Sequence, residues 1–263
     1  MWNSIFMSSG LQLFQRAELL YQQGKPSDTF EYYQKSIKKI LKDENVIAKI
    51  PFPVPADFPQ ELICVVWRNF LGFLRDPTMN FTEKSHPDAY KLLNSFRPSA
   101  PKPHPRLERT SRGKVIIKAM QITAALTLGV LAWDQRDRAT AAKRYQEALD
   151  VADTHPPFTS LAPGTVGLEK WVHEELEQGK DNLAVLIVND TVNAGLWGAE
   201  TKAGEVPTRR DVVDLPVPQT RIDKTGAVTQ EKKAEFATTP CKKCGVRAAK
   251  LQRCSVCRNV FCQ

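Results

Sequence analysis

Apolar residues recur at helical spacing near the start of the chain and predict a pair of helices. The first segment covers residues 11–21, and a Gly-Lys-Pro stretch suited to a turn follows it. Ser27 or Asp28 can cap the second segment by accepting a hydrogen bond from its first amides. The residues that share a face are Leu13, Ala17 and Leu20 in the first segment and Phe30, Tyr33, Ile37 and Ile40 in the second. The pattern therefore predicts a helical hairpin.

Similar patterns continue to residue 198 and predict a mainly α fold. The stretch IPFPVPADFP ends the first hairpin, because proline cannot continue a helix. The segment KVIIKAMQITAALTLGVLAW is apolar almost all round, which is typical of a helix buried on several sides. The later run LAVLIV is also compatible with a strand. The helices predicted after the first hairpin cover residues 60–76, 87–96, 114–133, 140–152, 169–180 and 181–197.

Residues 199–240 carry no such pattern and predict a flexible linker. This segment has one Leu, one Phe and no Trp or Tyr, and its seven acidic residues balance seven basic ones. A segment of this composition buries too little apolar surface to offset the entropy lost on ordering. We therefore expect the linker to isolate the helical body from the residues that follow it.

Both hairpins resemble the tetratricopeptide repeat, a helix-turn-helix unit of 34 residues. In the second hairpin, Leu128 and Gly129 match the Leu-Gly pair of the motif, and Ala141, Tyr145 and Ala148 match its small–aromatic–small pattern. Ala132 and Asp153 depart from the motif, which has a large residue and a proline there. The first hairpin is a looser match, through Ala17, Leu20, Gly24, Tyr33 and Ser36. The resemblance implies a TPR-like helical domain over residues 8–198, with an irregular helical bundle as the alternative.

Charge and apolar runs indicate an intracellular protein with its basic character at one end. The formal net charge is +8. Residues 241–263 hold six of the basic residues and no acid: Lys242, Lys243, Arg247, Lys250, Arg253 and Arg258. No secretory signal precedes the body, and the apolar run AMQITAALTLGVLAW is shorter than the roughly 20 residues that span a bilayer. We expect a buried core helix there, no membrane partner, and residence in the nucleus or cytoplasm.

Five of the six cysteines are gathered in CKKCGVRAAKLQRCSVCRNVFCQ, residues 241–263. A Cys-x-x-Cys pair lets two thiolates reach one ion from a tight turn, and Gly245 after the first pair suits such a turn. In a reducing compartment this spacing favours metal over disulfides, and soft thiolates favour Zn²⁺. The predicted zinc ligands are Cys241, Cys244, Cys254, Cys257 and Cys262. The first four could also close a single tetrahedral site and leave Cys262 spare.

The fifth cysteine makes the cluster similar to the opening of a MYND-type zinc finger. The matching elements are Cys241 and Cys244, the run Arg253-Cys254-Ser255, then Cys257 and the pair Phe261-Cys262. The family's later Cys, Trp, His and Cys do not follow within the sequence, so the resemblance implies an incomplete finger over residues 241–263. Family fingers are cross-braced around two ions. The resemblance assigns Cys241, Cys244 and Cys262 to one ion and Cys254 with Cys257 to the other.

The resemblance implies a zinc-dependent adaptor that binds a short, proline-containing peptide of a partner protein. A basic finger is also compatible with association with nucleic acid, although Phe261 is its single aromatic residue and stacking of bases is therefore disfavoured. The chain could alternatively be a fragment of a MYND-containing methyltransferase, but the Asn-His dipeptide such enzymes need does not occur. Phosphate-loop, nucleophile-elbow and His-Glu-x-x-His motifs are absent too. We therefore expect no catalytic residues and no small-molecule substrate.

The remaining residues with metal or nucleophile chemistry have no spacing that ties them to the cluster. Cys64 lies in the apolar run ELICVVW, where a lone cysteine is usually a small hydrophobe. The four histidines stand alone in the sequence, as His86, His104, His155 and His173. We expect none of them to bind the zinc.

Overall fold

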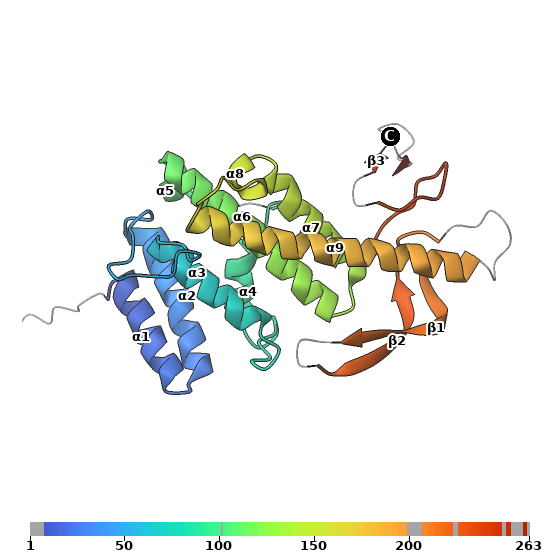
Figure 1. Ribbon diagram of the computed structural model, residues 1–263. Coiled ribbons are helices and arrows are strands. Elements are labelled where there is room, and N and C mark those ends of the chain that lie inside the picture. Colours follow the sequence, from blue (N-terminus) through green and yellow to red (C-terminus); the bar gives the residue numbers. More distant parts are fainter. Residues whose placement is uncertain are drawn as a thin grey trace, which may run out of the picture. The chain divides into compact units, whose positions relative to one another are not determined.

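The computed structural model describes residues 8–100, 102–198, 207–222, 226–248, 251–253 and 260–261. In these ranges it has nine helices and four short or medium strands (Figure 1), which confirms the prediction of a mainly helical protein. The chain divides into two compact units. One combines Met1–Thr127 with Val151–Leu176, and the other combines Leu128–Asp150 with Glu177–Gln263.

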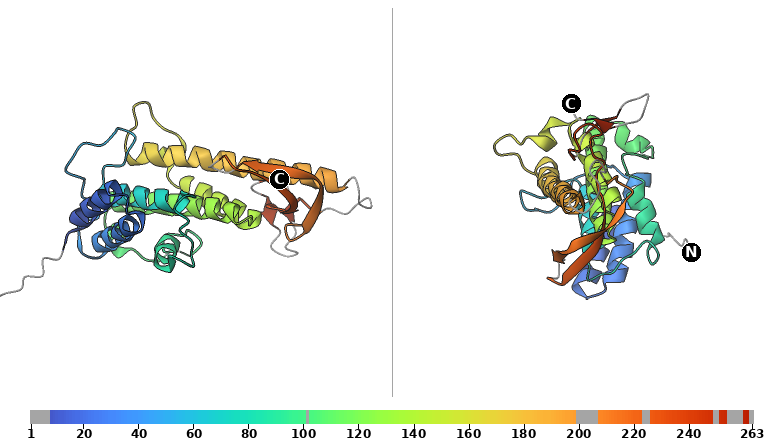
Figure 2. Two further views of the ribbon diagram at one scale, coloured as in Figure 1. Left: turned by 90° about the horizontal axis from the view of Figure 1, so that it is seen from below. Right: turned by 90° about the vertical axis from the view of Figure 1, so that its right-hand side faces the viewer.

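The first unit opens with the predicted helical hairpin, formed by α1 (Gly10–Gln22) and α2 (Pro26–Asp43). Ser9 caps α1 in a capping box with Gln12, and Gly24 supplies the left-handed turn between the helices with φ of 68°. The two helices approach closely where Ser36 donates a hydrogen bond to the carbonyl of Gly10 at 2.7 Å. The blue pair in Figure 2 shows them side by side.

An aromatic core holds the rest of the first unit together. Helices α3 (Leu62–Arg75) and α4 (Pro87–Asn94) follow the hairpin, and the short helices α5 (Pro105–Glu108) and α8 (Pro156–Thr159) complete the unit's smaller elements. The ring of Phe30 on α2 stacks on Phe70 of α3, with centroids 5.2 Å apart. Trp67 is fully buried, and its indole N–H donates to the Thr123 hydroxyl at 2.9 Å, so its one polar atom is satisfied.

Helix α6 (Ser111–Asp134) contains the long apolar run. Within the described residues it is the one helix long and apolar enough to cross a membrane, and 56% of its most apolar window is buried inside the protein. Ile116, Ala119 and Ile122 are completely buried along it. A largely buried apolar helix is also typical of a soluble core, which was the expectation from the sequence.

The second hairpin packs closely where it lies in the second unit. The end of α6 packs on α7 (Arg138–Ala152), and a Cβ added at Gly129 would stand 2.7 Å from the Tyr145 ring. Ala141, Tyr145 and Ala148 are all buried on α7. The small residues therefore allow the aromatic ring of one helix to lie against the backbone of the other.

The prediction of two helices over residues 169–197 is wrong, because α9 (Leu168–Gly198) is continuous through 31 residues. Gly179 lies inside it, close to the boundary expected between the two helices. A glycine costs a helix about 1 kcal/mol relative to alanine and does not remove a backbone hydrogen bond, whereas a proline would. The alternative of a strand at LAVLIV is excluded by the same helix.

Within residues 199–240, for which the composition predicts a flexible linker, the described part forms a β-hairpin. Strands β1 (Val212–Ile222) and β2 (Val228–Glu235) pair antiparallel, with an irregularity between Asp214 and Gln219 where Pro216 and Pro218 cannot donate to the ladder. Val213, Leu215, Ala234 and Phe236 are buried, and Ala194 and Trp197 of α9 pack against them. Strand side chains alternate between faces, so one buried face sufficed to order this segment.

Candidate metal site at the C-terminal cysteines

Two of the five predicted zinc ligands, Cys241 and Cys244, lie in the described part of the chain. The other three, Cys254, Cys257 and Cys262, lie outside the described residues. The described residues bring together no group of three or more His, Cys, Asp or Glu that could hold a metal ion. The cross-braced arrangement and the single four-cysteine site therefore both stay predictions.

The first cysteine pair lies on a tight turn closed by backbone hydrogen bonds. The Gly245 amide donates to the Cys241 carbonyl at 2.9 Å, and the Cys241 amide donates to the Val246 carbonyl at 2.8 Å. Gly245 has φ of 74°, in the left-handed region that glycine enters without strain. Gly245, which the sequence predicts to form a turn, therefore lies at the position of that turn that requires a left-handed conformation.

A further amide points at the sulfur of the first cysteine. The backbone N–H of Lys243 donates to Cys241 Sγ at 3.4 Å. Hydrogen bonds to a ligating atom orient it and tune its affinity for a metal. The Cys241 residue is 2% exposed, whereas Cys244 is exposed, so the pair faces the solvent through one of its members. These two residues fit the first half of a zinc-binding turn.

Short strands frame the remaining cysteines in the sequence. Strand β3 (Gln252–Arg253) pairs antiparallel with β4 (Val260–Phe261), with Gln252 opposite Phe261. Cys254 directly follows β3 in the sequence, and Cys262 directly follows β4. The second cysteine pair therefore lies between β3 and β4 in the sequence, and the fifth cysteine follows β4.

The histidines and Cys64 lie in the first unit, where they make packing and polar contacts. His104 stacks on the Phe96 ring with centroids 4.1 Å apart, and burial lowers its pKa. His173 Nδ1 lies 2.9 Å from the Phe158 carbonyl oxygen. Cys64 is 1% exposed on α3, and burial raises the pKa of its thiol well above the usual value. A thiol in this state is inert toward metals, since the thiolate is the ligand.

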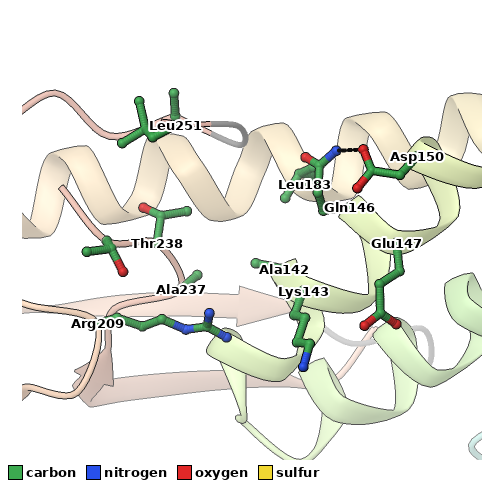
Figure 3. A pocket seen from close by; sticks show the side chains of 12 residues that line it. Ala142, Lys143, Gln146, Glu147, Asp150, Leu183, Arg209, Ala237, Thr238 and Leu251 are labelled. Carbon is green, nitrogen blue, oxygen red and sulfur yellow. Dashed lines mark hydrogen bonds between the residues drawn. The ribbon is translucent and has the colours of Figure 1, made fainter. Parts of the chain in front are cut away.

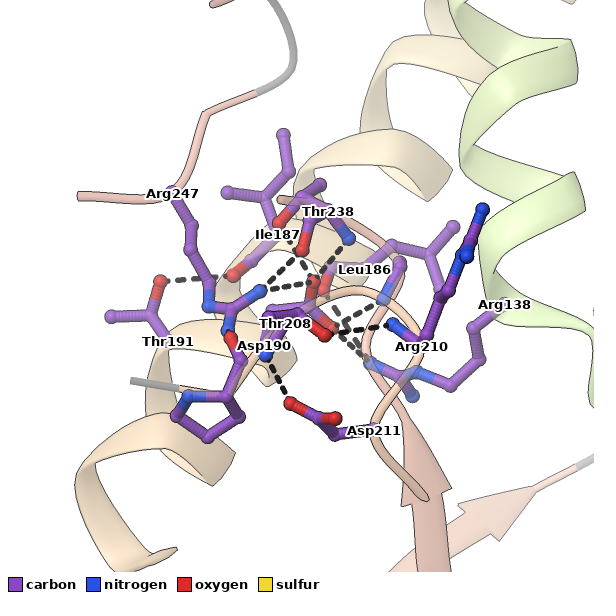
Figure 4. A network of polar contacts seen from close by, with 12 residues as sticks. Arg138, Leu186, Ile187, Asp190, Thr191, Thr208, Arg210, Asp211, Thr238 and Arg247 are labelled. Carbon is purple, nitrogen blue, oxygen red and sulfur yellow. Dashed lines mark hydrogen bonds and ion pairs between the residues drawn. The ribbon is translucent and has the colours of Figure 1, made fainter. Parts of the chain in front are cut away.

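The sequence analysis missed a buried carboxylate next to the cysteine turn. Asp190, on α9, is completely buried and lies at the centre of the polar network in Figure 4. Its oxygens accept hydrogen bonds from the Ala237 amide at 3.0 Å, and from the Thr238 amide and hydroxyl at 2.6 and 2.7 Å. Two guanidiniums add charge, Arg138 at 3.3 Å and Arg247 at 3.8 Å. The signal was present: Asp190 falls at helical spacing from the buried Leu183 and Leu186.

Arg247 belongs to this network and does not contribute to a basic surface. Its guanidinium donates to the carbonyls of Thr238 and Pro207 and lies 4.1 Å from the centre of the Phe236 ring. Burial lowers its pKa, and the charge of Asp190 acts in the opposite direction. Lys242 and Lys243 are exposed beside it. Arg247 is therefore not available to a phosphate-binding surface.

Each unit also has an open hollow. The hollow of the second unit has a volume of about 390 Å³ and lies between α7, α9 and the segment around Thr238 (Figure 3). Its walls mix the apolar Ala142, Leu183 and Leu251 with charged side chains of both signs. The hollow of the first unit, about 380 Å³, is lined by Tyr21, Arg68 and Trp171 among others. Neither set of walls has a single chemical character that would select a ligand.

Comparisons with known proteins add nothing to these residues. No protein-family model matches the chain, and neither a curated protein nor a solved structure matches it.

Proposed function

We propose that this chain is a zinc-binding interaction protein, in which a helical body and a C-terminal MYND-type finger recognise a short segment of a partner protein. The observation that carries the proposal is the Cys241–Gly245 turn, with its left-handed glycine and its amide directed at Cys241 Sγ. A turn of this kind presents two thiolates to one ion, and the sequence supplies three more cysteines directly after it. Zn²⁺, when bound, would cross-link the segment.

The helical body supports the same proposal through its two hairpins. The approach of α1 to α2 at Gly10, and of α6 to α7 at Gly129, is typical of packed helix pairs with small residues at the crossing. TPR-like hairpins offer surfaces to peptides and carry no catalytic groups of their own. We accordingly propose no enzymatic activity, an intracellular location and a protein partner whose recognised segment contains proline.

Nucleic-acid association is the weaker candidate. Arg247 supplies part of the positive charge of residues 241–263, but its side chain is buried and contacts Asp190, Thr238 and Pro207. The exposed Lys242 and Lys243 would attract phosphate without selecting a sequence. We expect duplex DNA to bind the chain only weakly and to dissociate as salt approaches the physiological range.

The test of the proposal is the zinc content of the purified chain and its dependence on single cysteines. Zinc should copurify with the chain, and Cys241→Ser or Cys244→Ser should lower the amount bound. Cys64→Ser is the matched control, because Cys64 is buried in α3 within the other unit and should leave the zinc content unchanged. A chain that binds no zinc, or equal loss in the Cys64 control, would contradict the proposed metal site.

Partner recognition needs a separate measurement. The zinc-loaded chain should bind members of an array of short proline-containing peptides, and a chelator should abolish that binding. Matched peptides with each proline replaced by alanine provide the control for sequence recognition. Binding that survives complete removal of zinc would assign recognition to the helical body and not to the finger.

A further inference from the structure

We infer that Asp190 positions the Cys241–Cys244 turn, so that the first metal-binding pair is held against α9 and does not hang from a flexible linker. The inference rests on the proposed function, because it concerns the same cysteines. It adds Asp190, which lies about fifty positions before Cys241 in the sequence and belongs to no metal-binding motif. All residues involved belong to the second compact unit.

The approach to the turn is fixed from the N-terminal side. Ala237 and Thr238 come four and three residues before Cys241. Their two backbone amides and the Thr238 hydroxyl all donate to the carboxylate of Asp190, at distances between 2.6 and 3.0 Å. Three hydrogen bonds to an ionised acceptor are stronger than the same bonds to a neutral one. The chain therefore enters the turn in one defined conformation.

The exit from the turn is fixed by the same carboxylate through Arg247. This residue comes three positions after Cys244 and approaches Asp190 to 3.8 Å. Its two terminal nitrogens donate to the carbonyls of Thr238 and Pro207, and its flat face lies over the Phe236 ring. Figure 4 shows Arg247, Thr238 and Asp190 converging from different segments. Both ends of residues 238–247 are thus tied to one point on α9.

Burial makes this arrangement cooperative. The side chains of Asp190 and Arg247 are 0% and 1% exposed, and that of Arg138 is 4% exposed. A buried charge is costly unless it is paired and hydrogen-bonded, and among the described residues Asp190 finds most of its partners in segment 237–247. The segment should therefore dock completely or not at all.

A docked turn should bind metal more tightly than a loose one. Ligands that are already ordered lose less conformational entropy when they bind, and loss of outer supporting contacts typically lowers metal affinity about 10–100-fold. The competing view is that Asp190 only stabilises the second unit. That view predicts lower stability on mutation but no specific effect on the turn.

The experiment uses the full chain and compares Asp190→Asn with Leu183→Ala. Leu183 is buried on the same helix, so its truncation lowers the stability of the second unit without removing a contact of Asp190. Zinc affinity is measured by titration against a competing chelator, and the circular dichroism of each variant confirms that it is folded. We expect Asp190→Asn to bind zinc at least about tenfold more weakly and Leu183→Ala to remain near the unmodified chain.

A second readout does not involve metal. Hydrogen exchange of the Cys241 and Gly245 amides, whose bonds close the turn, is followed in the presence of chelator. We expect both amides to be protected in the unmodified chain and in Leu183→Ala, and to lose protection in Asp190→Asn. Arg247→Lys provides the second variant if Asp190→Asn does not fold, because lysine keeps the charge but cannot donate to both carbonyls as a fork.

The outcomes separate this inference from the proposed function. Equal zinc affinity and equal protection in the unmodified chain and the network variants would overturn the inference alone. Amides that exchange freely in the unmodified chain would overturn it as well. A chain that takes up no zinc would overturn the proposed function, and the exchange measurement would then decide by itself whether Asp190 holds the turn.

Discussion

Gly245 illustrates at the scale of a residue how backbone conformation and metal binding are linked. Its φ is 74°, and among the described residues beyond its two chain neighbours no atom lies within 4 Å of the position a Cβ would take. Replacing it by alanine should therefore cost about 1–2 kcal/mol through backbone strain, with no steric clash. We predict that Gly245→Ala lowers zinc affinity roughly 5–30-fold, measured by competitive titration.

The matched control for this substitution is Gly72→Ala on α3. Gly72 likewise has nothing within 4 Å of its would-be Cβ, but it lies in a helix, where alanine is favoured over glycine. We expect Gly72→Ala to leave zinc affinity unchanged. A Gly245→Ala chain with unaltered affinity would mean that the left-handed turn is unnecessary for binding.

Cys262 distinguishes the two ligand assignments left open by the sequence. In the cross-braced assignment, Cys262→Ser removes a ligand from the ion held by Cys241 and Cys244 and should lower its affinity. In the single-site assignment, Cys241, Cys244, Cys254 and Cys257 close the tetrahedron and Cys262→Ser should change nothing. We predict a loss of affinity, together with fewer than two tightly held zinc ions per chain by elemental analysis.

One tightly held ion that is indifferent to Cys262→Ser would select the single four-cysteine site. Cys64→Ser is again the control for the loss of a thiol as such, because its side chain is buried in α3. An equal decrease in zinc content in that control would contradict both ligand assignments, because the zinc content would then follow folding and not ligation.

The sequence predicted the cysteine turn but not the carboxylate beside it, and the reason is physical. A Cys-x-x-Cys-Gly turn is local, so five consecutive residues are enough to recognise it. Asp190 acts through Ala237, Thr238 and Arg247, and the sequence does not state that these residues meet. The sign available in the sequence was an acidic residue at helical spacing from Leu183 and Leu186.

At the scale of elements, helices could be predicted and the β-hairpin could not. The periodicity of α1, α2 and α3 is visible within each segment, because a helix places residues three and four apart on one face. The hairpin of β1 and β2 buries Val213, Leu215, Ala234 and Phe236, a modest set interrupted by prolines and charges. Its partners are on α9, so composition alone understated the surface it could bury.

Helix pairing in the second unit gives a prediction at this scale. Because a Cβ at Gly129 would stand 2.7 Å from the Tyr145 ring, a larger residue must displace the ring or separate the helices. We predict that Gly129→Val lowers the free energy of unfolding by about 1–3 kcal/mol, as overpacking usually does. Denaturant unfolding followed by circular dichroism measures the change.

Two comparisons isolate the contact with the ring. Gly72→Val places the same side chain on a helix where the would-be Cβ meets nothing within 4 Å, and should cost less than Gly129→Val. In a Tyr145→Ala background, the cost of Gly129→Val should shrink, since the obstructing ring is gone. Equal cost with and without the ring would contradict close packing of these helices.

At the scale of the whole molecule, the prediction of a linker implied that the helices and the residues after Gly198 fold independently. The described contacts connect them. α9 begins within the first unit and continues into the second, where Ala194 and Trp197 pack on the β-hairpin. Removing residues 199–263 would also take away Ala237, Thr238 and Arg247. Arg138 would then be the remaining described partner of the Asp190 carboxylate.

This dependence predicts that one substitution has different effects in two chain lengths. In the full chain, Asp190→Asn leaves Arg138 and Arg247 without a buried counter-charge and should cost about 3–5 kcal/mol of unfolding free energy. In a chain ending at Gly198, which retains α1 to α9, the carboxylate has already lost most of its partners. The same substitution should there cost less than half as much. Denaturant unfolding of the four chains gives the comparison, and equal costs at both lengths would show that Asp190 acts within the helices alone.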